Sequence, residues 1–163
     1  MSIKFFITGG TIDGLEYQLE EDAPKKHRSL IPGLLKQSRV TVKRSVEELF
    51  HKDSRHINND DRALIYKKCL ECKEDKIIIA HGTMTMTATA KYLGKNNLPK
   101  TIVLVGAMVP ANKENSDALF NIGAAVSAVQ LLPVGVYIVM NGQIFSWDNV
   151  KKNLEKAIFE LEK

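Results

Sequence analysis

Three turns rich in glycine and threonine carry the residues of this chain best suited to chemistry. The turns are Thr8-Gly9-Gly10-Thr11, His81-Gly82-Thr83-Met84-Thr85-Met86 and Gly106-Ala107-Met108-Val109-Pro110. Their glycines let the backbone approach a ligand closely and leave amide N–H groups free. Convergent N–H groups and threonine hydroxyls suit a small anionic or carbonyl substrate. Taken singly, each turn fits a purely structural role equally well.

Short apolar segments precede the turns and predict the strands of a sheet. We expect strands at residues 3–7, 76–80, 101–105 and 134–140, and a weaker alternating strand at 39–43. The Asn141-Gly142 turn predicts a β-hairpin near the C-terminus, between 134–140 and 143–147. Helices are expected at 60–73, 84–94, 116–131 and 150–161. The alternation predicts an α/β fold: a three-layer, mostly parallel twisted sheet with helices on both faces.

The carboxyl ends of parallel strands meet at one edge of a sheet, where ligands bind. We therefore expect the three turns to lie together at that edge. Residues 14–26, rich in charged side chains, follow the first strand directly and are predicted to form a lid.

Length and charge restrict the class of protein. The 163 residues predict a single domain spanning 1–163. The net charge of +4 is spread along the chain, which gives little support for nucleic-acid or membrane binding. No apolar run approaches the roughly 20 residues that cross a bilayer, and the first residues lack a secretory pattern. We expect a cytoplasmic protein without a membrane partner.

The remaining polar motifs favour structural roles. Cys69 and Cys72 form a CxxC, but they fall at the far end of the helix predicted at 60–73, and no second ligand pair accompanies them. We expect two reduced thiols, and neither a metal nor a cofactor. No phosphate loop follows a strand. His81 is predicted to be a buried imidazole bonded to backbone.

Taken in order, the turns resemble one known family. The matching segments are Thr8-Gly9-Gly10-Thr11-Ile12, residues 81–86, residues 106–108 and Ser116-Asp117-Ala118-Leu119-Phe120-Asn121. Together they look like the bacterial-type L-asparaginase and glutaminase family, whose N-terminal catalytic domain has a Rossmann-like sheet. The resemblance implies a single-domain, short-chain amidohydrolase. Such an enzyme would convert the side-chain amide of L-asparagine, or a related small amide, to the acid and ammonia.

The resemblance implies that Thr11 is the nucleophile that forms an acyl-enzyme. A threonine hydroxyl needs a neighbouring base or hydrogen-bonding tyrosine and donors for the oxyanion. Tyr17, on the loop that follows, matches the family's assisting tyrosine, with Glu16 as a competitor. Gly10 and Gly82 would line the substrate site.

Thr83 resembles the family's second threonine, which works with a lysine. Residues 141–153 resemble the segment that carries this lysine, and Lys152 is the best register, with Lys151 one residue away. A lysine in a dry site has a lowered pKa and can accept a proton. From the residues alone, both lysines are simply the solvated start of the helix predicted at 150–161.

Ser54, preceded by Asp53, resembles the family's serine that binds the substrate's α-carboxylate, and both are assigned to substrate binding. Met84 is the important departure, because the family carries aspartate there to contact the α-ammonium. A thioether cannot replace a carboxylate in that contact. Three outcomes stay open: another acid (Asp53, Asp117 or Glu16) takes over, the substrate lacks an α-amino group, or catalysis is lost.

An alternative hypothesis is a catalytically silent domain that binds an amino acid or small amide on the same scaffold. The family's second domain is missing from these 163 residues, so we expect a homodimer to cover the apolar surface left by its absence.

Overall fold

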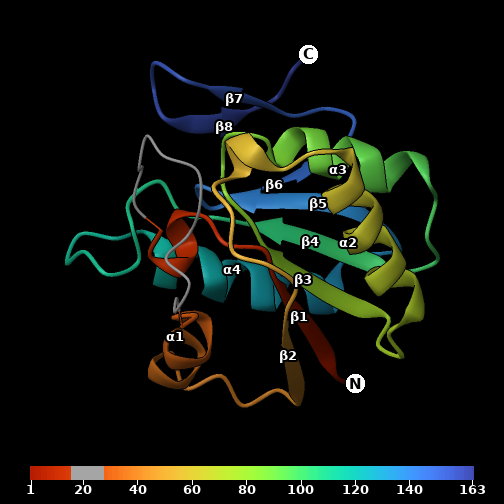
Figure 1. Cartoon of the computed structure of the whole chain (residues 1–163), viewed down its shortest axis with the longest axis horizontal. Coiled ribbons are helices and arrows are strands. Elements are labelled where there is room, and N and C mark those ends of the chain that lie inside the picture. Colours follow the sequence, from red (N-terminus) through yellow and green to blue (C-terminus); the bar gives the residue numbers. More distant parts are fainter. Residues whose placement is uncertain (16–27) are drawn as a thin grey trace.

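Six strands form one sheet in the computed structural model, which describes residues 1–15 and 28–163 (Figure 1). The strand order is β2-β1-β3-β4-β5-β6. Five strands are parallel: β1 (Ile3–Ile7), β2 (Arg44–Glu48), β3 (Lys76–Ala80), β4 (Thr101–Val105) and β5 (Gly135–Met140). The last strand, β6 (Gln143–Ser146), runs antiparallel to β5 through the Asn141-Gly142 turn. The predicted parallel sheet and hairpin are confirmed.

Helices cover both faces of this sheet, as predicted. The helices are α1 (Ile31–Gln37), α2 (Asn59–Glu71), α3 (Met86–Lys95) and α4 (Ala118–Leu131), with 3₁₀ turns η1 (Thr11–Asp13) and η2 (Ser54–His56). Figure 1 shows α2 and α3 on one face and α4 on the other. Strand β3 links both layers: Ile77 and Ile79 contact the α2–α3 core, whereas Ile78 joins the α1–α4 core.

The helix predicted at 150–161 is wrong. This segment forms a second, two-stranded sheet from β7 (Lys151–Asn153) and β8 (Ile158–Glu160), above β6 in Figure 1. Phe159 is completely buried in the α2–α3 core. Side-chain amides hold the irregular backbone, since Asn141 Oδ1 accepts from Phe159 N at 2.8 Å and Asn153 Oδ1 from Lys156 N at 3.0 Å. Burial of Phe159 and these local bonds outweigh helix propensity.

Two further differences lie near the β2 edge. The strand predicted at 39–43 begins instead at Arg44, because Arg39 takes a left-handed turn (φ 52°) after α1. Val40 and Val42 still pack against the core. Their alternating pattern therefore reflects burial of these two side chains and not pairing in a strand. Helix α1 was not predicted. It starts with Pro32 in its first turn, where proline is tolerated, and is only seven residues long.

The two cysteines are free thiols at the end of α2, as expected. Burial raises the pKa of the Cys69 thiol, and the neighbouring Cys72 adds to the shift. Across the described residues no helix has the length and apolarity to span a membrane, and no group of three or more metal-ligating side chains occurs.

Two helical glycines offer a matched test of this packing. Gly94, predicted as a helix end, lies inside α3, where an added Cβ would stand 2.2 Å from Trp147 Cδ2. Gly123 in α4 has no atom within 4 Å of the same position. We expect Gly94→Ala to lower the free energy of unfolding by about 1–3 kcal/mol through overpacking. Gly123→Ala should raise it by about 0.5–1 kcal/mol. Urea unfolding followed by circular dichroism measures both, and changes of the same sign would contradict the packing described.

Candidate active site

The turns after β1 and β3 meet in one pocket at the carboxyl edge of the sheet. Its lining consists of Gly10, Thr11, Leu15, Asp53, Ser54, Gly82, Thr83 and Met84. Because Ile7 pairs with Ala80, the two strands end at the same level. Seven of the predicted site residues therefore lie together, and Leu15 is the lining residue that was not predicted. Tyr17 and Glu16 fall outside the described residues.

Gly10 allows the two turns to touch. Its φ is +84°, and a Cβ there would stand 2.5 Å from both Cα and N of Gly82. A side chain at position 10 would push the turns apart. The contact of these two backbones brings Thr11 and Thr83 into the same pocket.

Thr11 opens η1 and is almost completely buried. Its hydroxyl donates to the carbonyl of Ala107, and its own carbonyl accepts from Ala111 N at 2.9 Å. A carbonyl cannot take up a proton. If Thr11 acts as a nucleophile, a group other than this hydrogen-bond partner must therefore take up its proton.

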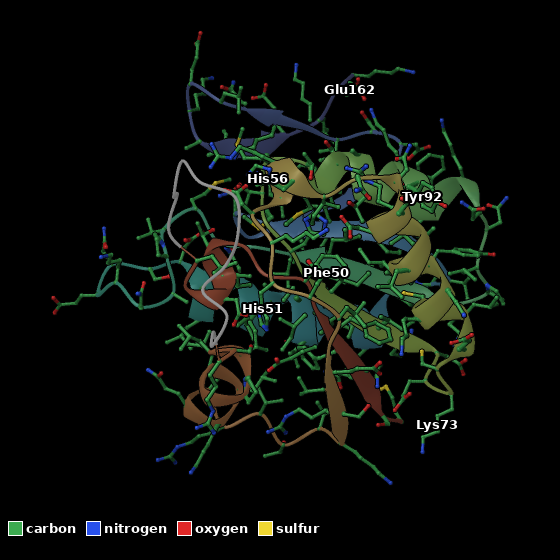
Figure 2. All side chains as sticks on the ribbon, viewed as in Figure 1. Phe50, His51, His56, Lys73, Tyr92 and Glu162 are labelled. Carbon is green, nitrogen blue, oxygen red and sulfur yellow. The ribbon has the colours of Figure 1, made fainter. Side chains whose placement is uncertain are left out.

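Asp13 fixes the end of η1. Its Oδ1 accepts from Ser29 Oγ and Leu30 N, both at 2.7 Å, and its Oδ2 lies 3.1 Å from His51 Nδ1. Figure 2 labels His51, which comes from the loop after β2. This buried carboxylate ties the Thr11 turn to α1 and to that loop.

Ser54 is buried beside the second turn rather than free in the pocket. Its Oγ accepts from Met84 N at 3.1 Å and Thr85 N at 3.2 Å, and its carbonyl accepts from Thr85 Oγ1 at 2.6 Å. Among the described residues the hydroxyl proton of Ser54 has no acceptor. Ser54 thus shapes the Thr83–Thr85 turn and keeps one donor for a ligand.

Asp53 is paired with Arg55. The Arg55 Nε lies 3.1 Å from both carboxylate oxygens of Asp53, and Arg55 Nη2 lies 2.7 Å from Oδ2. Burial acts to raise the pKa of Asp53, but hydrogen bonds from the Arg55 side chain and backbone outweigh it and hold this pKa below its usual value.

Lys152 reaches Thr83 from β7. Its Nζ donates to Thr83 Oγ1 at 2.8 Å and lies 3.2 Å from Met84 Sδ. Its neighbour Lys151 is exposed, with its Nζ 3.5 Å from Glu160. Burial lowers the pKa of Lys152, and the charge of Asp53 opposes this shift. The geometry therefore favours the register at Lys152, although β7 replaces the expected helix.

A buried chain of hydrogen bonds supports the second turn. The sequence predicted its first member, the buried His81, but not the other members, Thr89 and Arg62. His81 Nδ1 lies 2.7 Å from Gly82 O, and Nε2 lies 2.9 Å from Thr89 Oγ1, which accepts from Arg62 Nε at 3.3 Å. Because the Gly82 carbonyl can only accept, Nδ1 carries the ring proton, and in the neutral ring Nε2 then accepts from the Thr89 hydroxyl. Burial lowers the pKa of His81 to about 4, consistent with a neutral ring.

Asp117, one of the acids considered as a substitute for position 84, has another role. Its carboxylate accepts from Met108 N and Val109 N at 3.0 Å and from Asn121 Nδ2 at 2.8 Å. These bonds hold the third turn at the start of α4. Asp117 does not line the pocket.

Sequence comparisons place the chain in a known family. The family described as "Asparaginase, N-terminal" matches residues 2–158, and the chain belongs to that asparaginase family. A glutaminase-asparaginase from Pseudomonas fluorescens biotype A is 28% identical over 98% of this chain and 48% of its own length. One subunit of a glutamyl-tRNA(Gln) amidotransferase from Methanococcus maripaludis is 42% identical over 47% of this chain and 19% of its own length.

Solved structures show the same fold. A probable cytoplasmic L-asparaginase from Campylobacter jejuni superposes with a TM-score of 0.82 at 29% identity, over 98% of this chain and 52% of that one. The thermostable L-asparaginase from Thermococcus kodakarensis superposes with a TM-score of 0.82 at 25% identity, over 99% of this chain and 51% of that one. The chain spans about half the length of these asparaginase relatives.

Substitution of Thr89 tests the hydrogen-bond chain that supports the second turn. Thr89→Val keeps the shape but leaves His81 Nε2 and Arg62 Nε without their buried partner. We expect the free energy of unfolding to fall by about 1–3 kcal/mol. Thr89→Ser keeps the hydroxyl and should lose less. Chemical denaturation compares the two variants, and equal losses would show that the hydroxyl does not carry the effect.

Proposed function

We propose that this domain is an amidohydrolase that converts a small side-chain amide, of the kind found in L-asparagine, to the acid and ammonia through a threonine acyl-enzyme. The observation that carries the proposal is the 2.8 Å contact between Lys152 Nζ and Thr83 Oγ1, in the pocket that also holds Thr11. Membership of the asparaginase family supports it.

In the proposed first step, Thr11 Oγ attacks the amide carbon. As the C–O bond forms and the C–N bond breaks, the hydroxyl proton passes through Thr83 to a neutral Lys152 amine, which returns it to the departing nitrogen. Ammonia leaves, and water hydrolyses the ester to regenerate Thr11. N–H groups of the glycine turns would stabilise the oxyanion. Tyr17 is proposed as a further assisting group.

Burial of Lys152 supports its role as proton acceptor. A lysine acts as a base only when neutral, and the lowered pKa increases the neutral fraction at a given pH. The Thr11 hydroxyl donates instead to the Ala107 carbonyl, which cannot accept its proton. The mechanism therefore requires this hydroxyl to turn from Ala107 toward Thr83 as substrate enters.

The second candidate function is a binding domain without turnover. Two observations favour it: the hydroxyl of Thr11 is directed at a carbonyl, and Met84 rather than a carboxylate contacts Lys152. Calorimetry separates the candidates, because saturable binding of asparagine without ammonia release fits the binding domain.

We also propose that the domain forms a homodimer in the cytoplasm. The compartment follows the description of the Campylobacter jejuni relative. Apolar side chains of α4 and β6 remain exposed, among them Phe120 at 64% and Ile144 at 50%. Such surface is commonly covered by a second subunit.

Removal of the proposed nucleophile tests the function. Wild-type protein should release ammonia from L-asparagine or a related small amide, and Thr11→Ala should reduce the rate by about 10³-fold or more. Thr87→Ala, on α3 and outside the pocket, is the matched control and should retain the rate. Unchanged ammonia release by Thr11→Ala would overturn the mechanism.

Adjacent lysines provide a second test. Lys152→Met should lower the rate by about 10²-fold or more because the proton acceptor is lost, whereas Lys151→Met should stay within about twofold. With wild type, the rate should rise with pH as Lys152 loses its proton, with a midpoint below the ordinary lysine pKa of about 10.4. Equal effects of the two substitutions would remove Lys152 from the mechanism.

A further inference from the structure

The polar partners of Lys152, a half-buried amine, are unusual. Within hydrogen-bonding distance its Nζ has a hydroxyl, Thr83 Oγ1, and a thioether, Met84 Sδ. Across the part of the chain that the structure describes, no carboxylate lies within ion-pair distance of it. Among the described residues the amine therefore has no negative partner at contact range, and the charge of Asp53 acts on it from farther away.

Asp53 is the one acid among the eight lining residues. Both of its oxygens already accept hydrogen bonds from Arg55, at 2.7–3.1 Å. This pair is close to neutral as a unit, and pulling the carboxylate away to meet a ligand would break those bonds. The described lining thus offers an incoming cation no uncommitted carboxylate.

A substrate ammonium would bind poorly in this pocket. It would exchange water for the Met84 thioether. A thioether accepts these protons poorly, and an ionised group without a partner is costly to bury. A substrate of the same shape without the ammonium avoids this cost.

A substrate carboxylate, by contrast, finds donors. Ser54 accepts from two backbone N–H groups and keeps its hydroxyl proton for a ligand. A hydroxyl polarised by two N–H donors is a stronger donor itself, which suits an anionic oxygen.

From this charge pattern we infer that the preferred substrate is a small ω-amide acid that carries no ammonium beside its carboxylate, with Met84 as the residue that sets the preference. The inference rests on the proposed amidohydrolase function and names its substrate class. Succinamate and L-asparagine are the matched probes, because they differ only by the α-ammonium.

Steady-state ammonia release from the two amides tests the preference. We expect wild-type kcat/KM for succinamate to exceed that for L-asparagine by about tenfold or more, which corresponds to about 1.4 kcal/mol. Met84→Asp supplies the missing carboxylate beside Lys152 and should shift this ratio toward asparagine by a similar factor. Met84→Leu, which keeps an apolar side chain, should leave the ratio within about threefold of wild type.

A wild-type enzyme that prefers asparagine, or a ratio that Met84→Asp leaves unchanged, would overturn the inference. If neither amide is hydrolysed, the proposed function fails, and binding decides the inference separately. Calorimetric titration with succinamate and L-asparagine should then show tighter binding of succinamate to wild type and a reversed order for Met84→Asp. Equal binding of both, or binding of neither, would contradict it.

Discussion

The candidate site depends on the contact between two glycine backbones. Strands β1 and β3 end side by side. The turns that follow them pack against each other, backbone to backbone, at Gly10 and Gly82. A Cβ at Gly10 would collide with Gly82, and a Cβ at Gly82 would stand 2.8 Å from the Ser54 side chain. Three segments far apart in sequence are therefore stacked at van der Waals distance. Thr11 and Thr83 share a pocket because the residues before them, Gly10 and Gly82, have no side chain to hold the two turns apart.

Backbone hydrogen bonds, carboxylates and side-chain donors together hold the arrangement around this contact. Lys52 N donates to Thr8 O at 3.0 Å, which sets the loop carrying Asp53 and Ser54 beside the first turn. A chain of neutral and cationic donors, from His81 to Arg62, braces the second turn from behind. Most polar groups of the pocket already have partners: Asp53 is paired with Arg55, and the Thr11 hydroxyl donates to Ala107. Lys152, which reaches Thr83 from β7, has a hydroxyl and a sulfur within hydrogen-bonding distance.

Sequence patterns predicted the centre of the molecule better than its periphery. Buried parallel strands such as β3 and β4 are continuous apolar runs, so their positions follow from composition, and the glycine turns mark where they end. Segments whose structure depends on distant partners were missed. Residues 150–161 have a helical spacing, but Phe159 is drawn into the core and Asn141, from another hairpin, caps its backbone. The link from His81 through Thr89 to Arg62 likewise carries no local signal, and Lys152 was found through family resemblance alone.

Lys152 stands on a short hairpin that is not part of the main sheet. Strands β7 and β8 have three residues each and pair only with one another in the described structure, and the buried anchor Phe159 fixes them to the rest. Such a unit opens at lower free energy than the six-stranded sheet. When it lifts away, the amine leaves Thr83 while both glycine turns stay in place. If Lys152 is the proton acceptor that we propose, opening of this hairpin stops the proposed reaction while the sheet stays folded, so warming should abolish that activity before it melts the sheet.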